Sequence, residues 1–177
     1  MKYLKGRIPS IGGEHINWEG DFNLERIRYV PKEFHENQRK SWVKPFDILM
    51  VKDGATTGKV AIVGEDFPFE DCNINEHVFR IEVDERYNPF YVFAYLFSGL
   101  GQQQISRLTS GAAQKGITKD AIKQIAIPVP PPETQNAIGD RAKRARDESR
   151  QLRVEAKDII EKAKEQVERM MVEDKMI

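Results

Sequence analysis

A cluster of prolines divides the sequence into two parts that follow different patterns. Four prolines lie between residues 128 and 132, whereas residues 133–177 contain no proline and a single glycine. Proline lacks a backbone N–H and restricts the residue before it, so a proline cluster ends regular structure, whereas a long stretch without proline permits one continuous helix. We therefore predict two domains, one over residues 1–132 and one over residues 133–177.

The second part carries a heptad pattern. Small or apolar residues recur at alternating steps of four and three residues, as in a coiled coil. These positions predict the residues of helix pairing, which are Ile138, Ala142, Ala145, Leu152, Ala156, Ile159 and Ala163. Acid-to-base pairs four residues apart, such as Asp158 with Lys162, support one helix of about 60 Å. We expect it to pair with a partner helix, and the alternative is that it packs onto its own domain.

Before the proline cluster, short apolar runs alternate with turn residues, which is typical of short strands. We predict buried strands over residues 46–52 and 59–63, a third strand over residues 75–83 and an edge strand over residues 125–129. Asn88 is a favourable N-cap for a helix over residues 89–97, and Thr118 is one for a helix that ends near residue 124. This mixture predicts a compact α+β domain.

The composition narrows the classes of function. The chain has 28 basic and 28 acidic residues, which excludes a uniformly basic coat but permits a local positive face that binds nucleic acid. The single cysteine, Cys72, excludes a disulfide framework and a cysteine-rich zinc site. No apolar stretch approaches the roughly 20 residues of a membrane span, and the N-terminal residues lack the apolar core of a signal peptide. We therefore expect a cytoplasmic protein without a membrane anchor.

The run from Gly54 to Val60 resembles a phosphate-binding loop only in part. Three residues separate its two glycines, and Val60 follows the lysine. A nucleotide-binding P-loop needs four residues there and a Ser or Thr after the lysine to hold magnesium. A tight hairpin between two strands is one interpretation. A further interpretation is a DNA-contacting turn, because lysines and threonines suit contacts to phosphates and base edges.

Two segments carry a local excess of positive charge. Residues 39–59 hold five bases and two acids, and residues 99–124 hold four bases and one acid. Gln side chains can pair with adenine, and Arg or Lys with guanine. The predicted DNA-contacting residues are Lys52, Thr56, Thr57, Lys59, Arg107, Ser110, Gln114 and Lys115. An ordinary solvated surface is the alternative.

No motif predicts a catalytic residue, a metal site or a cofactor. Residues 88–91 differ from the Asn-Pro-Pro-Tyr motif of amino methyltransferases in the second proline, and no glycine-rich loop for S-adenosylmethionine accompanies them. His77 lies near Cys72 in the sequence, but further ligands at metal-binding spacing are lacking. A helix start and a hydrogen-bonded histidine account for these residues.

Several runs, in order along the chain, resemble the DNA-specificity subunits of type I restriction–modification enzymes. The first run extends from Phe46 to Val63 and the second from Asn73 to Arg80. The third extends from Ser110 to Ile117 and is followed by Ile125 to Gln135 and a long charged helix. Because the ordered series covers nearly the whole chain, the resemblance is specific, even though each run alone is only moderately specific.

The resemblance implies a target-recognition domain followed by a long helix. Each such domain recognises one half of a split site in double-stranded DNA. The helices pair antiparallel, hold the domains apart and bind the methyltransferase subunits, with the restriction subunit as a further candidate partner. The specificity subunit itself catalyses no reaction.

A full subunit of this kind usually has two recognition domains and two helices, whereas this chain has one of each. The chain would therefore act as a half-subunit that forms a homodimer, or as part of a longer gene product. The alternative from another class is a coiled-coil interaction protein, such as a truncated specificity subunit, that dimerises through the helix and does not recognise DNA.

Overall fold

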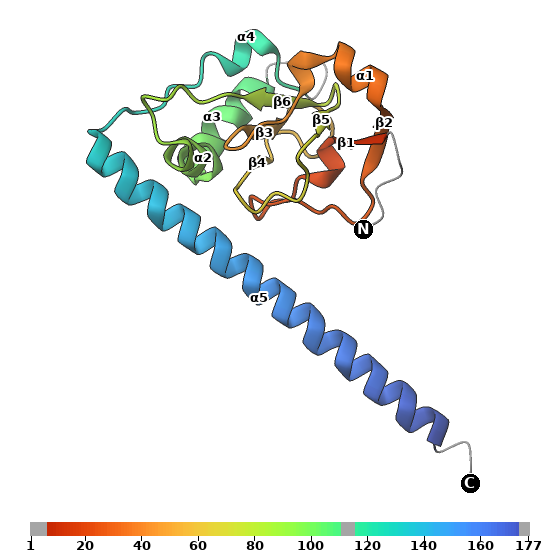
Figure 1. Cartoon of the computed structure of the whole chain (residues 1–177). Coiled ribbons are helices and arrows are strands. Elements are labelled where there is room, and N and C mark those ends of the chain that lie inside the picture. The colour runs from red at the N-terminus through yellow and green to blue at the C-terminus, as the bar shows by residue number, and fades with distance from the viewer. Residues whose placement is uncertain (1–6, 111–115, 174–177) are drawn as a thin grey trace. The chain divides into compact units, whose positions relative to one another are not determined.

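The computed structural model describes residues 7–110 and 116–173, and the chain divides into two compact units, residues 1–142 and 143–177. The first unit combines short strands with helices, and the last helix continues through the second unit (Figure 1). The elements are β1 (Arg7–Ile11), η1 (Gly13–His15), β2 (Arg28–Pro31), α1 (Lys32–Asn37), η2 (Arg39–Ser41), β3 (Ile48–Val51), β4 (Val60–Ile62), β5 (Asn73–Ile74), β6 (Val78–Ile81), α2 (Pro89–Phe97), α3 (Gly99–Ser110), α4 (Lys119–Ile122) and α5 (Pro132–Glu173). The predicted α+β class with a long C-terminal helix is confirmed.

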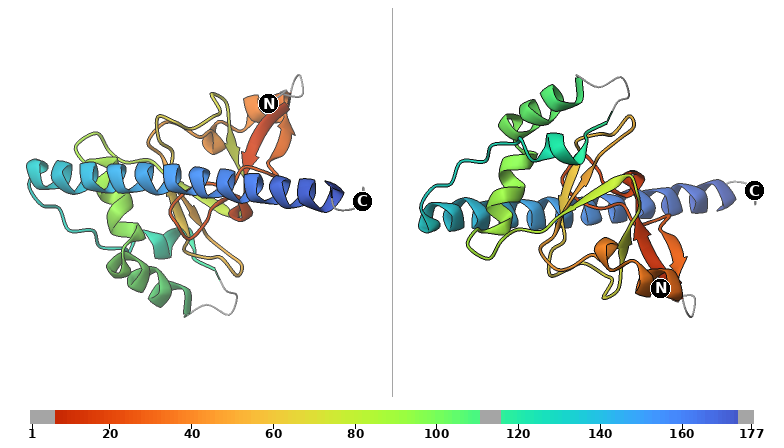
Figure 2. Two further views of the ribbon diagram at one scale, coloured as in Figure 1. Left: turned by 90° about the horizontal axis from the view of Figure 1, so that it is seen from below. Right: turned by 90° about the horizontal axis from the view of Figure 1, so that it is seen from above.

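The described strands form two three-stranded sheets. One has the order β2-β1-β5, in which β1 is antiparallel to β2 and parallel to β5. The other has the order β4-β3-β6, in which β3 is antiparallel to both neighbours. In Figures 1 and 2, β3 and β4 lie between α2 on one side and β1 with β2 on the other.

Strand β3 joins the two hydrophobic cores of the first unit. Its residues alternate, so that Ile48 and Met50 belong to the core that contains α2, whereas Leu49 and Val51 belong to the core that contains Ile11. All four side chains are at most 1% exposed. A strand buried on both faces needs a continuous apolar run, and this explains why the run Ile48–Val51 lacks the polar alternation of a surface strand.

The strands predicted over residues 46–52 and 59–63 correspond to β3 and β4. The strand predicted over residues 75–83 is correct only for β6. A turn separates it from β5, because the backbone N–H of Val78 donates to the carbonyl of Asn75 and that of His77 donates to the Asn75 side chain.

The edge strand predicted over residues 125–129 is wrong, since this segment is not assigned to a strand. Side chains supply its hydrogen bonds instead of a neighbouring strand. Gln104 accepts from the backbone N–H of Ala126 and donates to its carbonyl, while the Tyr91 hydroxyl donates to the carbonyl of Pro128. With prolines at this end of the segment, few backbone donors remain for a ladder.

The helix caps are confirmed. The Asn88 side chain accepts from the backbone N–H of Tyr91 at the start of α2, and Thr118 accepts from Ala121 at the start of α4. Helix α3 was not predicted, because its first turn contains Gly99 and Gly101 and most of its residues are polar. Gly101 is required there, since a Cβ atom would overlap the carbonyl oxygen of Tyr95.

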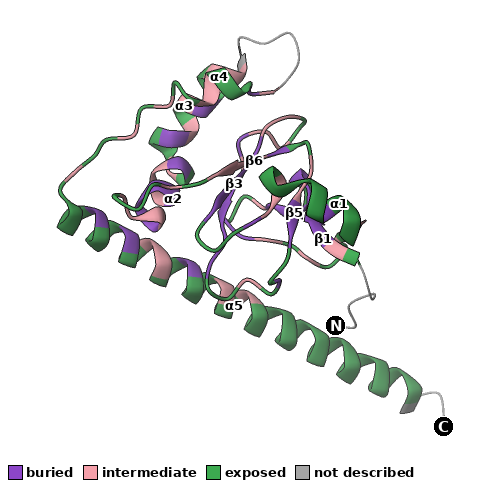
Figure 3. Cartoon of the chain, turned by 45° about the horizontal axis from the view of Figure 1, so that its top comes forward, coloured by how far each residue is buried: buried purple, intermediate pink, exposed green. Residues whose placement is uncertain are grey.

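The first turns of α5 belong to the first unit. Gln135 is buried, donates to the carbonyl of Pro130 and accepts from the backbone N–H of Asn88. Asn88 also donates to the Asn136 side chain, and Gly139 leaves room for Asn88, which a Cβ atom there would overlap. The second unit is the rest of this helix, and nearly all of its described residues are exposed (Figure 3). Among the described residues, we find no helix both long and apolar enough to cross a membrane.

Candidate nucleic-acid interface

The segment between β3 and β4 forms a tight turn. Gly54 and Gly58 adopt φ angles of 86° and 94°, a region that glycine reaches without strain. The Thr57 hydroxyl donates to the carbonyl of Gly54 at 2.7 Å, and the backbone N–H of Lys59 donates to Thr56 at 3.2 Å. Strand β4 follows directly, whereas a P-loop is followed by a helix. The hairpin interpretation of this run is therefore correct.

Helix α3 packs against the β3–β4 turn. Gln102 donates to the carbonyl oxygens of Gly58 at 3.0 Å and of Leu96 at 2.9 Å. A Cβ atom at Gly58 would press on Ile105, which is buried. The turn therefore rests on a packed helix, and this limits its freedom to move.

The chain also returns to the turn at Gly116. Gly116 forms a β-bridge with Asp53, and the backbone N–H of Ile117 donates to the carbonyl of Lys52 at 2.6 Å. Two segments that are far apart in the sequence, both predicted to contact DNA, therefore meet at this turn.

Of the predicted contact residues, four lie in the β3–β4 turn, two lie on α3 and two lie outside the described residues. Lys52, Thr56, Thr57 and Lys59 share the β3–β4 turn, and each is partly exposed. Arg107 is exposed on α3, and Ser110 is the last residue of that helix. Gln114 and Lys115 lie outside the described residues, although Gly116 follows them directly.

Acidic neighbours moderate the positive charge of the turn. The Lys52 ammonium lies 4.0 Å from the Asp53 carboxylate and 6.0 Å from the centre of the Phe79 ring. Asp53 also makes a 2.7 Å hydrogen bond to Nδ1 of His77. His77, which lies between β5 and β6, is thus hydrogen-bonded to the β3–β4 turn, and its partner was not predicted because the two residues are 24 positions apart in the sequence.

Trp18 was not among the predicted contact residues, and it is 55% exposed. The ammonium group of Lys59 lies 5.5 Å from the centre of the Trp18 ring. The available signal was a tryptophan set among the turn residues Asn17 and Gly20.

Neither a reactive cysteine nor a metal site accompanies the turn in the described part of the chain. Burial raises the pKa of the Cys72 thiol to about 12, so this thiol stays protonated and is a poor nucleophile. Among the described residues, no group of three or more His, Cys, Asp or Glu side chains could hold a metal ion.

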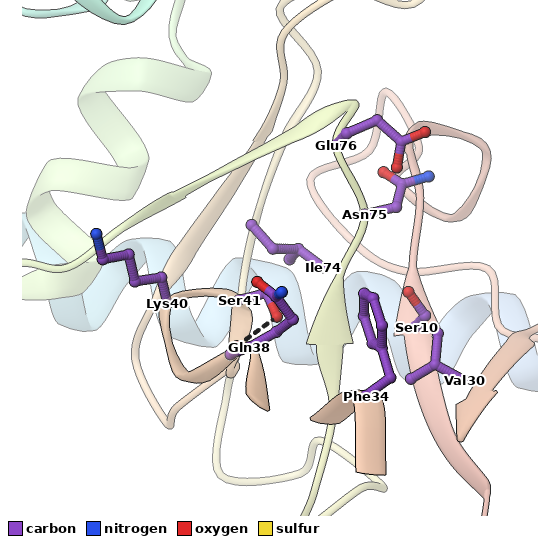
Figure 4. A pocket seen from close by; sticks show the side chains of 9 residues that line it. All are labelled: Ser10, Val30, Phe34, Gln38, Lys40, Ser41, Ile74, Asn75 and Glu76. Atoms are coloured by element: carbon purple, nitrogen blue, oxygen red, sulfur yellow. Dashed lines mark hydrogen bonds between the residues drawn. The ribbon is translucent and has the colours of Figure 1, made fainter. Parts of the chain in front are cut away.

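Figure 4 shows a hollow in the first unit that is lined by nine residues. It has a volume of about 370 Å³, and Phe34 of α1, Ser41 of η2 and Ile74 of β5 contribute to its lining. The Ser41 hydroxyl donates to the carbonyl of Gln38 at 2.8 Å. Among the predicted contact residues whose side chains the structure describes, none lines this hollow.

A family model and two curated relatives match most of the chain. The family model of the type I restriction modification DNA specificity domain matches residues 2–162. A putative type I restriction enzyme MjaX specificity subunit from Methanocaldococcus jannaschii is 37% identical over 129 residues, which are 72% of this chain and 28% of that protein. The type I restriction enzyme EcoBI specificity subunit from Escherichia coli is 29% identical over 136 residues, which are 76% of this chain and 28% of that protein.

Solved structures agree in fold. A chain from a study of complex assembly and conformational transition of the type I R-M system has a TM-score of 0.59 at 17% identity, and the match covers 85% of this chain and 39% of that one. The HsdS subunit from Thermoanaerobacter tengcongensis has a TM-score of 0.57 at 14% identity, with 83% and 37% covered. This chain thus spans little more than a quarter of the curated relatives that it matches. Because the family model matches most of this chain, the chain belongs to the family of type I restriction–modification DNA specificity domains.

Proposed function

We propose that the chain recognises a specific sequence in double-stranded DNA, as the specificity subunit or half-subunit of a type I restriction–modification complex. The observation that carries this proposal is the meeting of the β3–β4 turn with the segment that begins at Gly116. Lysine and threonine side chains on a supported turn can bind phosphates and reach base edges. In this role the chain supplies sequence recognition and catalyses no reaction.

We further propose that α5 pairs with a second helix and binds the methyltransferase subunits. The seam side chains Leu152 and Ile159 are 58% and 66% exposed in the single chain, and Ile138 is 41% exposed. A row of exposed apolar residues at heptad spacing favours association. Two copies would form a two-fold dimer, with the restriction subunit as a further partner of the assembled complex.

A pair of lysine variants tests DNA recognition. Lys59→Ala removes a charge from the β3–β4 turn, and Lys44→Ala removes one from the opposite end of β3, where Lys44 is exposed beside Glu82. Binding of a duplex is measured over a range of salt concentrations. Lys59→Ala should weaken binding and reduce the slope of log K against log salt by roughly one, the loss expected for one phosphate contact. Lys44→Ala should leave both unchanged, and equal effects of the two variants would place the interface elsewhere.

A deletion in α5 tests the spacer role. Removing the heptad Leu152–Asp158 shortens the helix by about 10.5 Å and keeps the seam in register. In the complex with methyltransferase subunits, the gap between half-sites should shrink by up to about three base pairs, because DNA rises about 3.4 Å per base pair. The bases recognised in each half-site should not change. Deleting four residues is the control, since it rotates the seam and should weaken assembly.

The same measurements separate this function from its alternative. A helix-pairing protein that does not recognise DNA would self-associate in light scattering but bind no duplex at any salt concentration. Duplex binding by the unmodified chain, alone or with methyltransferase subunits, would exclude that alternative.

A further inference from the structure

A short loop between η1 and β2 holds Trp18 in place. The Asn17 side chain accepts hydrogen bonds from the backbone N–H groups of Glu19 at 3.1 Å and Asp21 at 2.9 Å, and the Asn17 N–H donates to the carbonyl of Asp21 at 3.0 Å. Ile16 and Phe22 form a β-bridge at the base of the loop. These bonds close the loop on itself and leave Trp18 at its tip.

The loop also rests on α2. Gly20 has a φ angle of 75°, and a Cβ atom there would press on the rings of Phe93 and Phe97. The glycine therefore permits both the turn and the close approach to the helix. An aromatic side chain on a loop supported in this way loses little conformational entropy when it binds.

The two tryptophans of the chain have different environments. Trp42 stacks on His35 at 4.6 Å, lies below Arg39 at 5.7 Å and donates its indole N–H to the His35 carbonyl. It therefore has a structural role. Trp18 is 55% exposed, and the Lys59 ammonium lies 5.5 Å from the centre of its ring. Contacts within the described fold thus explain the position of Trp42, whereas about half of Trp18 remains exposed to water.

Trp18 lies beside the turn that we propose contacts DNA. Lys59 is the last residue of that turn, and its ammonium faces the indole ring. The same N-terminal segment approaches the turn again at Gly13, where a Cβ atom would lie 3.8 Å from the Thr56 hydroxyl. A duplex bound to Lys59 and Thr56 would therefore be within reach of Trp18.

The charges on the loop predict what kind of contact Trp18 makes. The loop from Asn17 to Asp21 has two acidic residues and no base, so its tip does not attract phosphate through its own charge. An aromatic ring can instead stack on a base or wedge against a base step, a contact that does not depend on salt. On the basis of the proposed DNA recognition, we propose that Trp18 contacts the bases or sugars of the duplex and that Lys59 binds a neighbouring phosphate.

The test compares Trp18→Ala, Trp18→Phe and Lys59→Ala in the full chain. The probe is a fluorescein-labelled duplex that carries a methylation site mapped by sequencing, and its anisotropy is measured at several salt concentrations. Trp18→Ala should weaken binding roughly tenfold at every concentration, with an unchanged salt slope. Trp18→Phe should retain most of the affinity. Lys59→Ala should reduce the slope.

Quenching of the intrinsic tryptophan fluorescence by DNA gives a second measurement. DNA should quench the tryptophan emission of the unmodified chain, and Trp18→Phe, which keeps Trp42, should remove this quenching. Because the Trp18 ring is largely exposed, the melting temperatures of the variants should match that of the unmodified chain.

Three outcomes would overturn the inference. Unchanged affinity in Trp18→Ala would show that the ring does not touch DNA. A loss accompanied by a lower salt slope would show that Trp18 acts only by positioning Lys59. Intact DNA binding with weaker methyltransferase association would show that the ring contacts a protein instead. If the unmodified chain binds no duplex, the proposed function fails and this inference fails with it.

Discussion

The two compact units of this chain differ in where their apolar side chains lie. In the first unit, Ile48 and Leu49 of β3 are fully buried. In the second unit, Leu152, Ile159 and Met170 are 58%, 66% and 60% exposed. Apolar burial is the main favourable contribution to folding, so the first unit has an internal source of stability. A single helix in water lacks that source.

The same residue type therefore has two different roles in this chain. Isoleucine in β3 stabilises a fold, whereas isoleucine on the seam of α5 is available for association, as proposed above. Substitutions of matched residues in the two units test this difference.

The largest effect is expected from shortening a buried isoleucine. Ile48→Ala removes a fully buried side chain from the core around α2 and should lower the free energy of unfolding by about 3 kcal/mol. Ile159→Ala makes the same change at an exposed seam position and should alter the first unit by less than about 0.5 kcal/mol. Urea unfolding followed by tryptophan fluorescence measures this, because both tryptophans lie in the first unit. Comparable losses in the two variants would break the comparison.

The next effect concerns a buried ion pair. Asp47 and Arg80 are 3.1 Å apart, with side chains 3% and 17% exposed. Arg80→Met would leave the carboxylate buried without its cation and should cost about 2 kcal/mol at neutral pH. The double variant Asp47→Asn with Arg80→Met should recover part of that loss, because the uncompensated charge is gone. A double variant that is less stable than Arg80→Met would contradict this explanation.

The pH dependence of Arg80→Met follows from the same pair. Burial raises the pKa of Asp47 above its ordinary value of 3.8, and the bonds to the Lys44 backbone and to Arg80 oppose that rise. Without Arg80 the pKa of Asp47 should rise further. An acid whose pKa is higher in the folded state binds more protons when folded, so it destabilises the fold as the pH rises through that range. The cost of Arg80→Met should therefore be smaller at mildly acidic pH than at pH 7.

A smaller effect is expected where α5 joins the first unit. Asn88 caps α2 and also donates to Asn136 of α5 at 2.9 Å. Asn88→Ala removes both contacts and should cost about 1 kcal/mol in chemical unfolding. Asn88→Ser is the matched control, since serine can cap the helix but is too short to reach Asn136. Equal losses in the two variants would assign the effect to the contact with α5 and not to the cap.

The smallest effect is expected from an ion pair of the second unit. Lys162 and Asp158 are 2.6 Å apart, but their side chains are 73% and 58% exposed. Asp158→Asn should change helix stability by only about 0.3 kcal/mol, and added salt should remove the difference. Circular dichroism at low and high salt measures it. A cost as large as that of Arg80→Met would show that burial does not set the strength of these pairs.

Much of the fold could be predicted because its signals are local. The apolar run of β3, the Asn88 and Thr118 caps and the heptad positions of α5 each depend on neighbours within a few residues. Side-chain periodicity and capping hydrogen bonds are properties of a short segment. The elements that they predicted were found, whereas the strand predicted over residues 75–83 is limited to Val78–Ile81.

Other features depended on contacts between distant segments. In residues 125–129, Gln104 and Tyr91 bond to the backbone of Ala126 and Pro128 in place of a neighbouring strand, and helix α3 tolerates Gly101 because that glycine lies against the end of α2. The order of the strands in the two sheets, with β5 beside β1, likewise has no local signal.

The sequence by itself determined the class of fold, the long helix, the position of the β3–β4 turn and the family resemblance. Only the tertiary structure decided that Asp53 binds His77, that Gly116 returns to the turn and that Trp18 faces Lys59. The physical reason is that a periodic pattern repeats within one segment, where the backbone sets its geometry. A pair such as Trp18 and Lys59 is separated by many residues, and packing of the whole core brings its members together.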